Sequence, residues 1–159
     1  MKKHVRIFAL LAVCVLALGA GTSLHGQNSP TNGLPGIAFL TTITDANTGA
    51  FSSRSVVTLH ADHSMSAIDS GQGGPGVQFS SQLGGWHTSP NAGVIGRTLD
   101  FSFPQAGIAR VDYNFTSLTK DGVTGTFTLT VFRLHDDPQG SGGIVVGTFN
   151  FTGVPIVVP

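Results

Sequence analysis

The chain has 159 residues, of which 40% are hydrophobic and 10% are charged, and its formal net charge at pH 7 is zero. Three of its eight basic residues lie among the first six positions, so the rest of the chain carries five basic residues against eight aspartates, a net charge of −3. Such a sparse, mildly acidic surface argues against nucleic acid and against an anionic membrane face as a partner.

The first 26 residues have the pattern of a secretory signal peptide. A basic start, Met1–Arg6, precedes an uncharged apolar run over residues 7–21, which is shorter than the about 20 apolar residues of a membrane span. We therefore expect an exported protein, secreted or periplasmic, with no stable membrane span after signal cleavage. Cys14, the only cysteine, lies in this segment, so the mature chain is predicted to have no disulfide and no cysteine-based metal site.

Residues 27–36 are rich in turn-forming residues and are predicted to be a flexible leader. Beyond them, residues 37–159 are enough for one domain with a hydrophobic core. Eight segments alternate apolar and polar side chains with the period of two that a β-strand requires. They are residues 37–44, 53–60, 64–70, 77–88, 94–103, 109–116, 123–134 and 143–153.

Short turns join these segments, and no segment has a helical period. The sequence therefore predicts an all-β fold, an eight-stranded antiparallel up-and-down meander. Closure into a barrel is the expected architecture because it removes the exposed edges of the sheet. A two-sheet β-sandwich is the alternative, since strand spacing alone does not separate the two.

The hairpin around residue 121 has its apolar residues at odd positions on both strands, so facing residues must sum to an even number. This parity predicts a three-residue loop, residues 120–122, with Gly122 left-handed in a bulge and Phe115 opposite Phe127. A second bulge is expected at Gly84–Gly85, where it would re-aim the side chain of Trp86.

The sequence around Trp86, together with the aspartate-containing turns and the eight-strand count, resembles the lipocalin-like (calycin) barrels. The resemblance extends over about residues 36 to 155 and is to small secreted bacterial members of unassigned function. It implies the barrel fold. Lipocalins place their Gly-x-Trp motif on the first strand, whereas Trp86 lies mid-chain, so the ligand preference of that family is not transferred.

The inward positions of such a barrel are dominated by aromatic residues. They either fill the interior as a solid core or line an apolar cup for a small hydrophobic ligand. Inward Gly125 and Gly147 favour the cup because they withdraw volume from the wall. Arg97 has the same parity as its apolar neighbours, and we expect it at the barrel mouth, either against Trp86 or as the anchor for a ligand carboxylate. The candidate ligand-binding residues are Trp86, Arg97, Phe101, Tyr113, Phe127 and Phe149.

The sequence offers little for catalysis or metal binding, and no catalytic residue, metal ligand or cofactor is assigned. It has no glutamate, no cysteine beyond the signal and no Gly-x-Ser-x-Gly motif. One turn with His60, Asp62 and His63 and one loop with residues 135–137 are interpreted as solvated turns. Asp100 shares its predicted outward face with Arg110 and Asp112, where the three would form a surface charge cluster.

These observations predict an exported, non-catalytic β-barrel protein that binds a small hydrophobic ligand in its lumen. A structural or protein-interaction module of the cell envelope is the alternative. A third reading is an enzyme that confines a reactive lipid, as the resemblance to allene-oxide-cyclase-type barrels implies. The oligomeric state is left open.

Overall fold

The structure, a computed structural model, describes residues 36–75, 78–90, 93–103, 106–157. The predicted signal peptide, Cys14 and all but the last residue of the predicted leader lie outside these residues. The described residues form one compact unit. Within the described ranges, no helix is long and apolar enough to cross a membrane.

The described residues form nine strands that follow one another along the chain, and each of the eight predicted segments overlaps at least one of them. The predicted segment 77–88 overlaps two, β4 and β5. The strands are β1 (Ile37–Asp45), β2 (Phe51–Leu59), β3 (Ser64–Asp69), β4 (Gln78–Phe79), β5 (Gln82–Ser89), β6 (Gly93–Phe103), β7 (Gly107–Thr119), β8 (Gly122–Arg133) and β9 (Ile144–Pro155).

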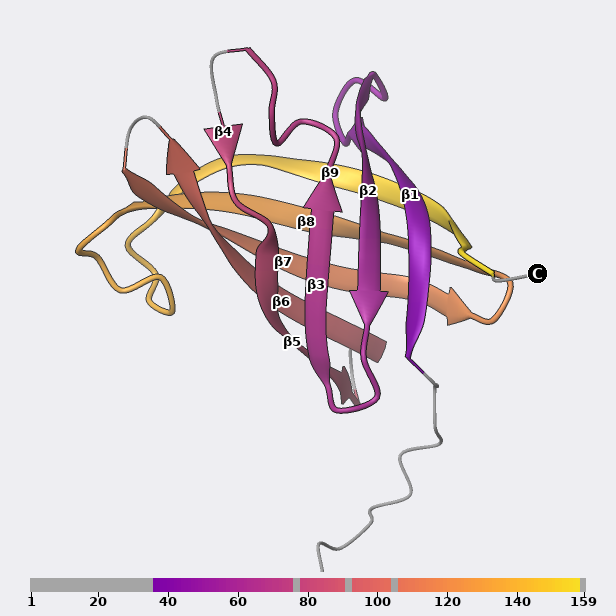
Figure 1. The fold of residues 1–159 in the computed structure, drawn as a ribbon. Helices are drawn as coiled ribbons and strands as arrows, with labels where there is room; N and C mark the ends of the chain where they lie inside the picture. Colours follow the sequence, from indigo (N-terminus) through magenta and orange to yellow (C-terminus); the bar gives the residue numbers. More distant parts are fainter. Residues whose placement is uncertain (1–35, 76–77, 91–92, 104–105, 158–159) are drawn as a thin grey trace, which may run out of the picture. The chain divides into compact units, whose positions relative to one another are not determined.

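Eight of these strands form a closed antiparallel barrel (Figure 1). The strand order is β1, β2, β3, β5, β6, β7, β8 and β9, and β9 pairs with β1 to close the sheet. Strand β4 is an addition that pairs only with the end of β6, at Gln78↔Phe103 and Phe79↔Ser102. The predicted up-and-down barrel is confirmed, and the sandwich alternative is wrong because a single continuous sheet contains every strand.

The β7–β8 hairpin keeps the predicted parity but places its extra residue elsewhere. Tyr113, not Phe115, lies opposite Phe127, and the strands are joined by the two residues 120–121. The register shifts between Phe115 and Ser117, so the bulge lies within β7 rather than in the turn. The predicted left-handed Gly122 is therefore wrong, and its φ is not positive.

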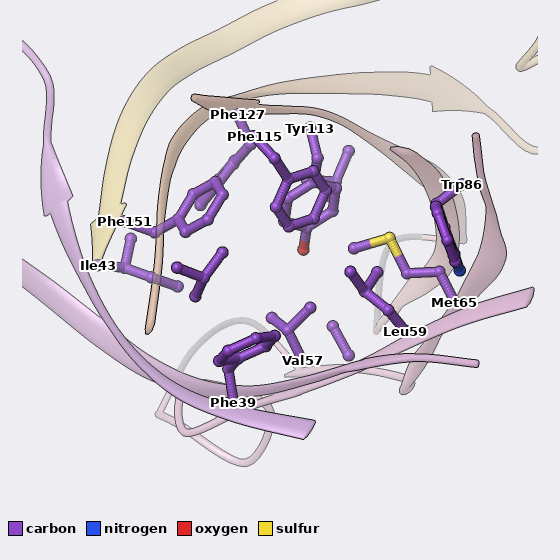
Figure 2. Packing of buried hydrophobic residues seen from close by; sticks show 13 residues of the cluster. Phe39, Ile43, Val57, Leu59, Met65, Trp86, Tyr113, Phe115, Phe127 and Phe151 are labelled. Carbon is purple, nitrogen blue, oxygen red and sulfur yellow. The ribbon is translucent and has the colours of Figure 1, made fainter. Parts of the chain in front are cut away.

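One end of the barrel interior is filled with large apolar side chains. We call it the packed end, and it is the end at which β1, β3, β6 and β8 begin. Figure 2 shows its side chains meeting from opposite walls of the barrel. Its members are Phe39, Leu59, Met65, Trp86, Phe115, Val123 and Phe151. Each is buried, so this end of the barrel is closed by packing.

Strand β6 shows the opposite face to the interior from the one predicted. Tyr113, Val111 and Ala109 of β7 are buried, and their partners on β6 are Gly96, Thr98 and Asp100. Directly paired residues lie on the same face of a sheet, so the even-numbered residues of β6 must face inward. These residues are small or polar, and at Gly96 the side chains of Met65 and Phe115 occupy the space that a Cβ would need.

Strand β5 is also corrected. Its registers with β3 and β6 run without interruption, so the predicted bulge at Gly84–Gly85 is absent from it. A Cβ on Gly84 would overlap the carbonyl oxygen of Arg97, which explains why glycine stands there. Leu83 is 67% exposed, whereas Gln82 and Trp86 are buried.

Candidate functional site

The interior of the other end of the barrel, which we call the open end, contains a cavity of ≈ 470 Å³. This is the end at which β2, β5, β7 and β9 begin. Most of the cavity wall is apolar, and exposed Ser52 and Val146 are among its outermost lining residues. The apolar lining residues are Ile43, Phe79, Ala109, Val111, Phe127, Leu129, Val131, Val146 and Phe149.

Asp100 is the most unusual residue of this cavity. Its side chain comes from the inward face of β6 and is only 4% exposed. The buried Oδ1 atom of this carboxylate has no hydrogen-bond partner among the described residues. Burial raises the pKa of Asp100 from its usual 3.8 to about 6, because transfer of a carboxylate out of water disfavours the charged form. The carboxyl group is therefore largely ionised at neutral pH although its Oδ1 atom has no partner among the described residues.

A hydrogen-bonded cluster lies at the inner side of the cavity, between it and the packed end. Gln82 lines the cavity, and its Oε1 atom accepts hydrogen bonds from the hydroxyl groups of Thr98, at 2.9 Å, and Tyr113, at 2.8 Å. Figure 2 shows the Tyr113 hydroxyl directed into the barrel interior. Both hydroxyl-bearing residues are buried. The two bonds satisfy both hydroxyl donors and the Gln82 Oε1 acceptor, and they fix the side chain of Gln82.

Asp69, near the end of β3, is the second carboxylate of the cavity. It accepts hydrogen bonds from the Ser53 hydroxyl at 2.8 Å and from the backbone N–H of Gly71 at 2.7 Å. Burial raises the pKa of the Tyr113 hydroxyl, and the negative charges of Asp69 and Asp100 raise it further. Both carboxylates therefore act electrostatically on one hydroxyl, which places them around the same interior space.

The structure brings together three of the six predicted site residues. Phe127 and Phe149 line the cavity, where their rings stack with centroids 5.0 Å apart, and Tyr113 belongs to the cluster at its inner side. Trp86 is buried in the packed end instead. Its Nε1 donates a hydrogen bond to the carbonyl of His60, and its ring stacks on His63.

Arg97 and Phe101, the remaining two, do not point into the barrel. Phe101 is 51% exposed, and the Arg97 side chain is 43% exposed on the outer wall. There the guanidinium group of Arg97 pairs with Asp112 and donates a hydrogen bond to Gln139. Asp112 also binds Arg110. Their predicted inward orientation is wrong because β6 has the reversed facing described above.

The predicted outward charge cluster is correct for Arg110 and Asp112 but not for Asp100, and Arg97 takes its place. The inward position of Gly125 is confirmed, but it does not widen the cavity. The aromatic ring of Phe151 covers it, within 2.6 Å of where a Cβ would be. In the described part of the chain, no group of three or more His, Cys, Asp or Glu residues is placed to hold a metal ion.

Sequence reasoning missed Asp69, Gln82 and Asp100. A signal for Asp100 was present, because the alternation of β7 identifies its inward residues and the short β6–β7 connection fixes which β6 residues pair with them. Compared with known proteins, the chain matches no family model, no curated protein and no solved structure.

Proposed function

We propose that the protein is an exported, non-catalytic binding protein that holds a small apolar ligand in the open-end cavity. The observation that carries this proposal is an apolar cavity of ≈ 470 Å³ into whose wall a buried, unpartnered carboxylate is built. Small-molecule sites are typically apolar clefts of about 300–1,000 Å³ with a few placed polar groups. The signal-like residues 1–26 support a secreted or periplasmic location.

The distribution of packing along the barrel supports a binding role over a purely structural one. A barrel that served only as a scaffold would gain stability from filling its interior at both ends, since each buried methylene contributes about 0.8 kcal/mol. Large side chains fill the packed end, but the open end retains a cavity and an uncompensated charge. Such a departure from good packing is typical of a functional site. We also propose that the barrel is lipocalin-like and that the protein is a member of the calycins.

The alternative function, an interaction module of the cell envelope, has one observation in its favour. The outer wall of β5 and β6 exposes large apolar side chains, among them Leu83, Phe101 and Phe103. Leu83 pairs directly with Leu99, so the apolar character continues across the two strands. Exposed apolar surface of this kind often marks a contact with another protein.

Titration with the uncharged fluorescent probe N-phenyl-1-naphthylamine tests the binding proposal. We expect saturable binding of one probe molecule per chain. The substitution Ala109→Phe should reduce the affinity by at least about tenfold, because a ring on Ala109 would occupy the cavity beside Asp100 and Val131. The matched control is Ile108→Phe, which adds the same ring at the neighbouring position on the outer face.

Circular dichroism shows whether each variant is folded. Ser102→Phe, at another position in the cavity lining, provides a second block should Ala109→Phe fail to fold. Equal affinity of the wild type and both blocked variants would place the probe outside the cavity and overturn the proposal. Absence of saturable binding would also contradict it and would favour the interaction module.

A further inference from the structure

We infer that the ligand of the open-end cavity is an organic amine, an ammonium group on a compact apolar body. This inference rests on the proposed function and specifies its ligand class. It reverses the ligand charge expected from the sequence, where Arg97 was a candidate anchor for a carboxylate. The ammonium group would bind at Asp100, and the apolar body would lie against the aromatic wall.

The charge of the cavity lining is the first argument. Two carboxylates, Asp69 and Asp100, line it, and among the described lining residues there is no lysine, arginine or histidine. Arg97 and Arg110 are engaged with Asp112 on the outer wall. A ligand carboxylate would therefore enter a site of like charge without a cation to receive it. A ligand cation would enter a site of opposite charge.

The state of Asp100 is the second argument. A carboxylate that is nearly fully buried requires hydrogen-bond donors or a counter-charge, because desolvation of an isolated ion is costly. Its Oδ1 atom has neither among the described residues. An ammonium group supplies both, since it carries a positive charge and three N–H donors. Asp69 already accepts two hydrogen bonds, from Ser53 and Gly71, so it contributes charge while Asp100 provides the free acceptor.

The shape and lining of the cavity give the third argument. The rings of Phe127 and Phe149 and the side chains of Leu129 and Val131 form an apolar wall. A cavity of ≈ 470 Å³ accommodates a single aromatic ring with a short chain better than a long acyl chain. An amine on a short chain would place its charge beside the carboxylates of the cavity and its apolar body against the apolar wall.

Three ligands of nearly equal shape test this inference. They are 4-phenylbutylamine, 4-phenylbutanol and 4-phenylbutyrate, each used at pH 7.5 to displace N-phenyl-1-naphthylamine from the wild-type protein. We expect the amine to bind at least about tenfold more tightly than the alcohol, and the carboxylate to bind more weakly than the alcohol. Asp100→Asn should remove the preference for the amine over the alcohol while the probe and the alcohol bind as before. Asp112→Asn, on the outer wall, is the matched control and should keep the preference.

The possible results distinguish a failure of the amine inference from a failure of the proposed function. If the probe and the alcohol bind but the amine binds no more tightly than the alcohol, the cavity binds ligands and the amine inference is wrong. An amine preference that persists in Asp100→Asn also overturns the inference, because the charge would then be recognised elsewhere. If neither the probe nor any of the three ligands binds, the proposed function itself fails. The comparison among ligands uses the wild type alone, so it remains decisive if a variant does not fold.

Discussion

The hydroxyl group of Tyr113 donates a 2.8 Å hydrogen bond to the side-chain oxygen of Gln82, a residue 31 positions earlier in the chain. Tyr113 comes from β7 and Gln82 from the beginning of β5, so the bond spans strands that are not neighbours in the barrel. It lies between the aromatic side chains of the packed end and the cavity of the open end. The pair would therefore limit the depth to which a ligand of the proposed site enters.

Removal of this bond should lower the stability moderately. Tyr113→Phe leaves the Thr98 hydroxyl as the remaining donor to Gln82, and we expect the free energy of unfolding to fall by about 1 kcal/mol. Thr98→Val should cost a similar amount. The double variant should cost more than the sum of the two, because the buried Gln82 oxygen would then lack both donors. Urea unfolding followed by circular dichroism measures all three, and strict additivity would contradict the shared-acceptor arrangement.

Asp100 should make the stability depend on pH. The carboxyl group has a pKa of about 6 in the folded chain against 3.8 for an exposed aspartate. Between these values the folded protein holds a proton that the unfolded chain has released, so stability falls as the pH rises from about 4 to about 6. Above pH 6 the free energy of unfolding is lowered by the full amount, about 3 kcal/mol.

Asp100→Asn removes this penalty because the amide does not ionise. We expect the variant to be more stable than the wild type at pH 7.5 by up to about 3 kcal/mol and equal to it near pH 4. Asp69, on β3, and the Tyr113 hydroxyl, on β7, are the other titratable groups around this space, and both remain in the variant. Urea unfolding at several pH values measures the difference. A difference that does not change with pH would show that Asp100 is not a buried carboxylate.

Two inward glycines on neighbouring strands should respond differently to alanine. A Cβ at Gly125 would overlap the backbone carbonyl oxygen of Asn114 and lie 2.6 Å from the Phe151 ring, whereas one at Gly147 would lie 3.3 Å from the Phe149 ring. Gly125→Ala is therefore expected to lower the free energy of unfolding by about 1–3 kcal/mol through overpacking. Gly147→Ala should cost less than about 1 kcal/mol. Thermal unfolding compares the two, and equal losses would contradict the division into a packed and an open end.

Arg97 should be dispensable for ligand binding. Its guanidinium lies on the outer wall with Asp112 and Gln139, so Arg97→Ala removes a surface ion pair worth about 0–1 kcal/mol. Probe affinity should stay within twofold of the wild type. A tenfold loss of affinity would mean that Arg97 reaches the ligand and that the candidate site is wrongly placed.

The strand positions and the closed barrel follow from the sequence because alternation of period two is strong in every long strand. The facing of β6 does not follow from its own sequence. Its odd-numbered residues are mostly apolar and would suit an inward face, whereas its even-numbered residues are mostly small or polar and would not. Alternation defines two faces of a strand without identifying the inner one. Only pairing with β7, where Tyr113 and Val111 are buried, decides between them.

The same reversal explains why the candidate site was only partly predictable. Phe127, Phe149 and Tyr113 lie on strands whose inner face was predicted correctly, and all three contribute to the cavity or its inner side. Asp100 was assigned to the outer wall because it alternates with the apolar odd-numbered residues of β6, which were predicted to face inward. A carboxylate is also rarely buried without a partner. The residue that breaks this rule is the one that best marks the site.

Methyl-labelled NMR shows in one titration where in the barrel a ligand binds. On addition of 4-phenylbutanol, an uncharged ligand, we predict saturable shifts of the methyl signals of Ile43, Leu129 and Val131 in the open-end cavity. The methyl signals of Leu59 and Val123 in the packed end should not move. Shifts confined to outer-wall residues such as Leu83, or no saturable shift at all, would contradict the account.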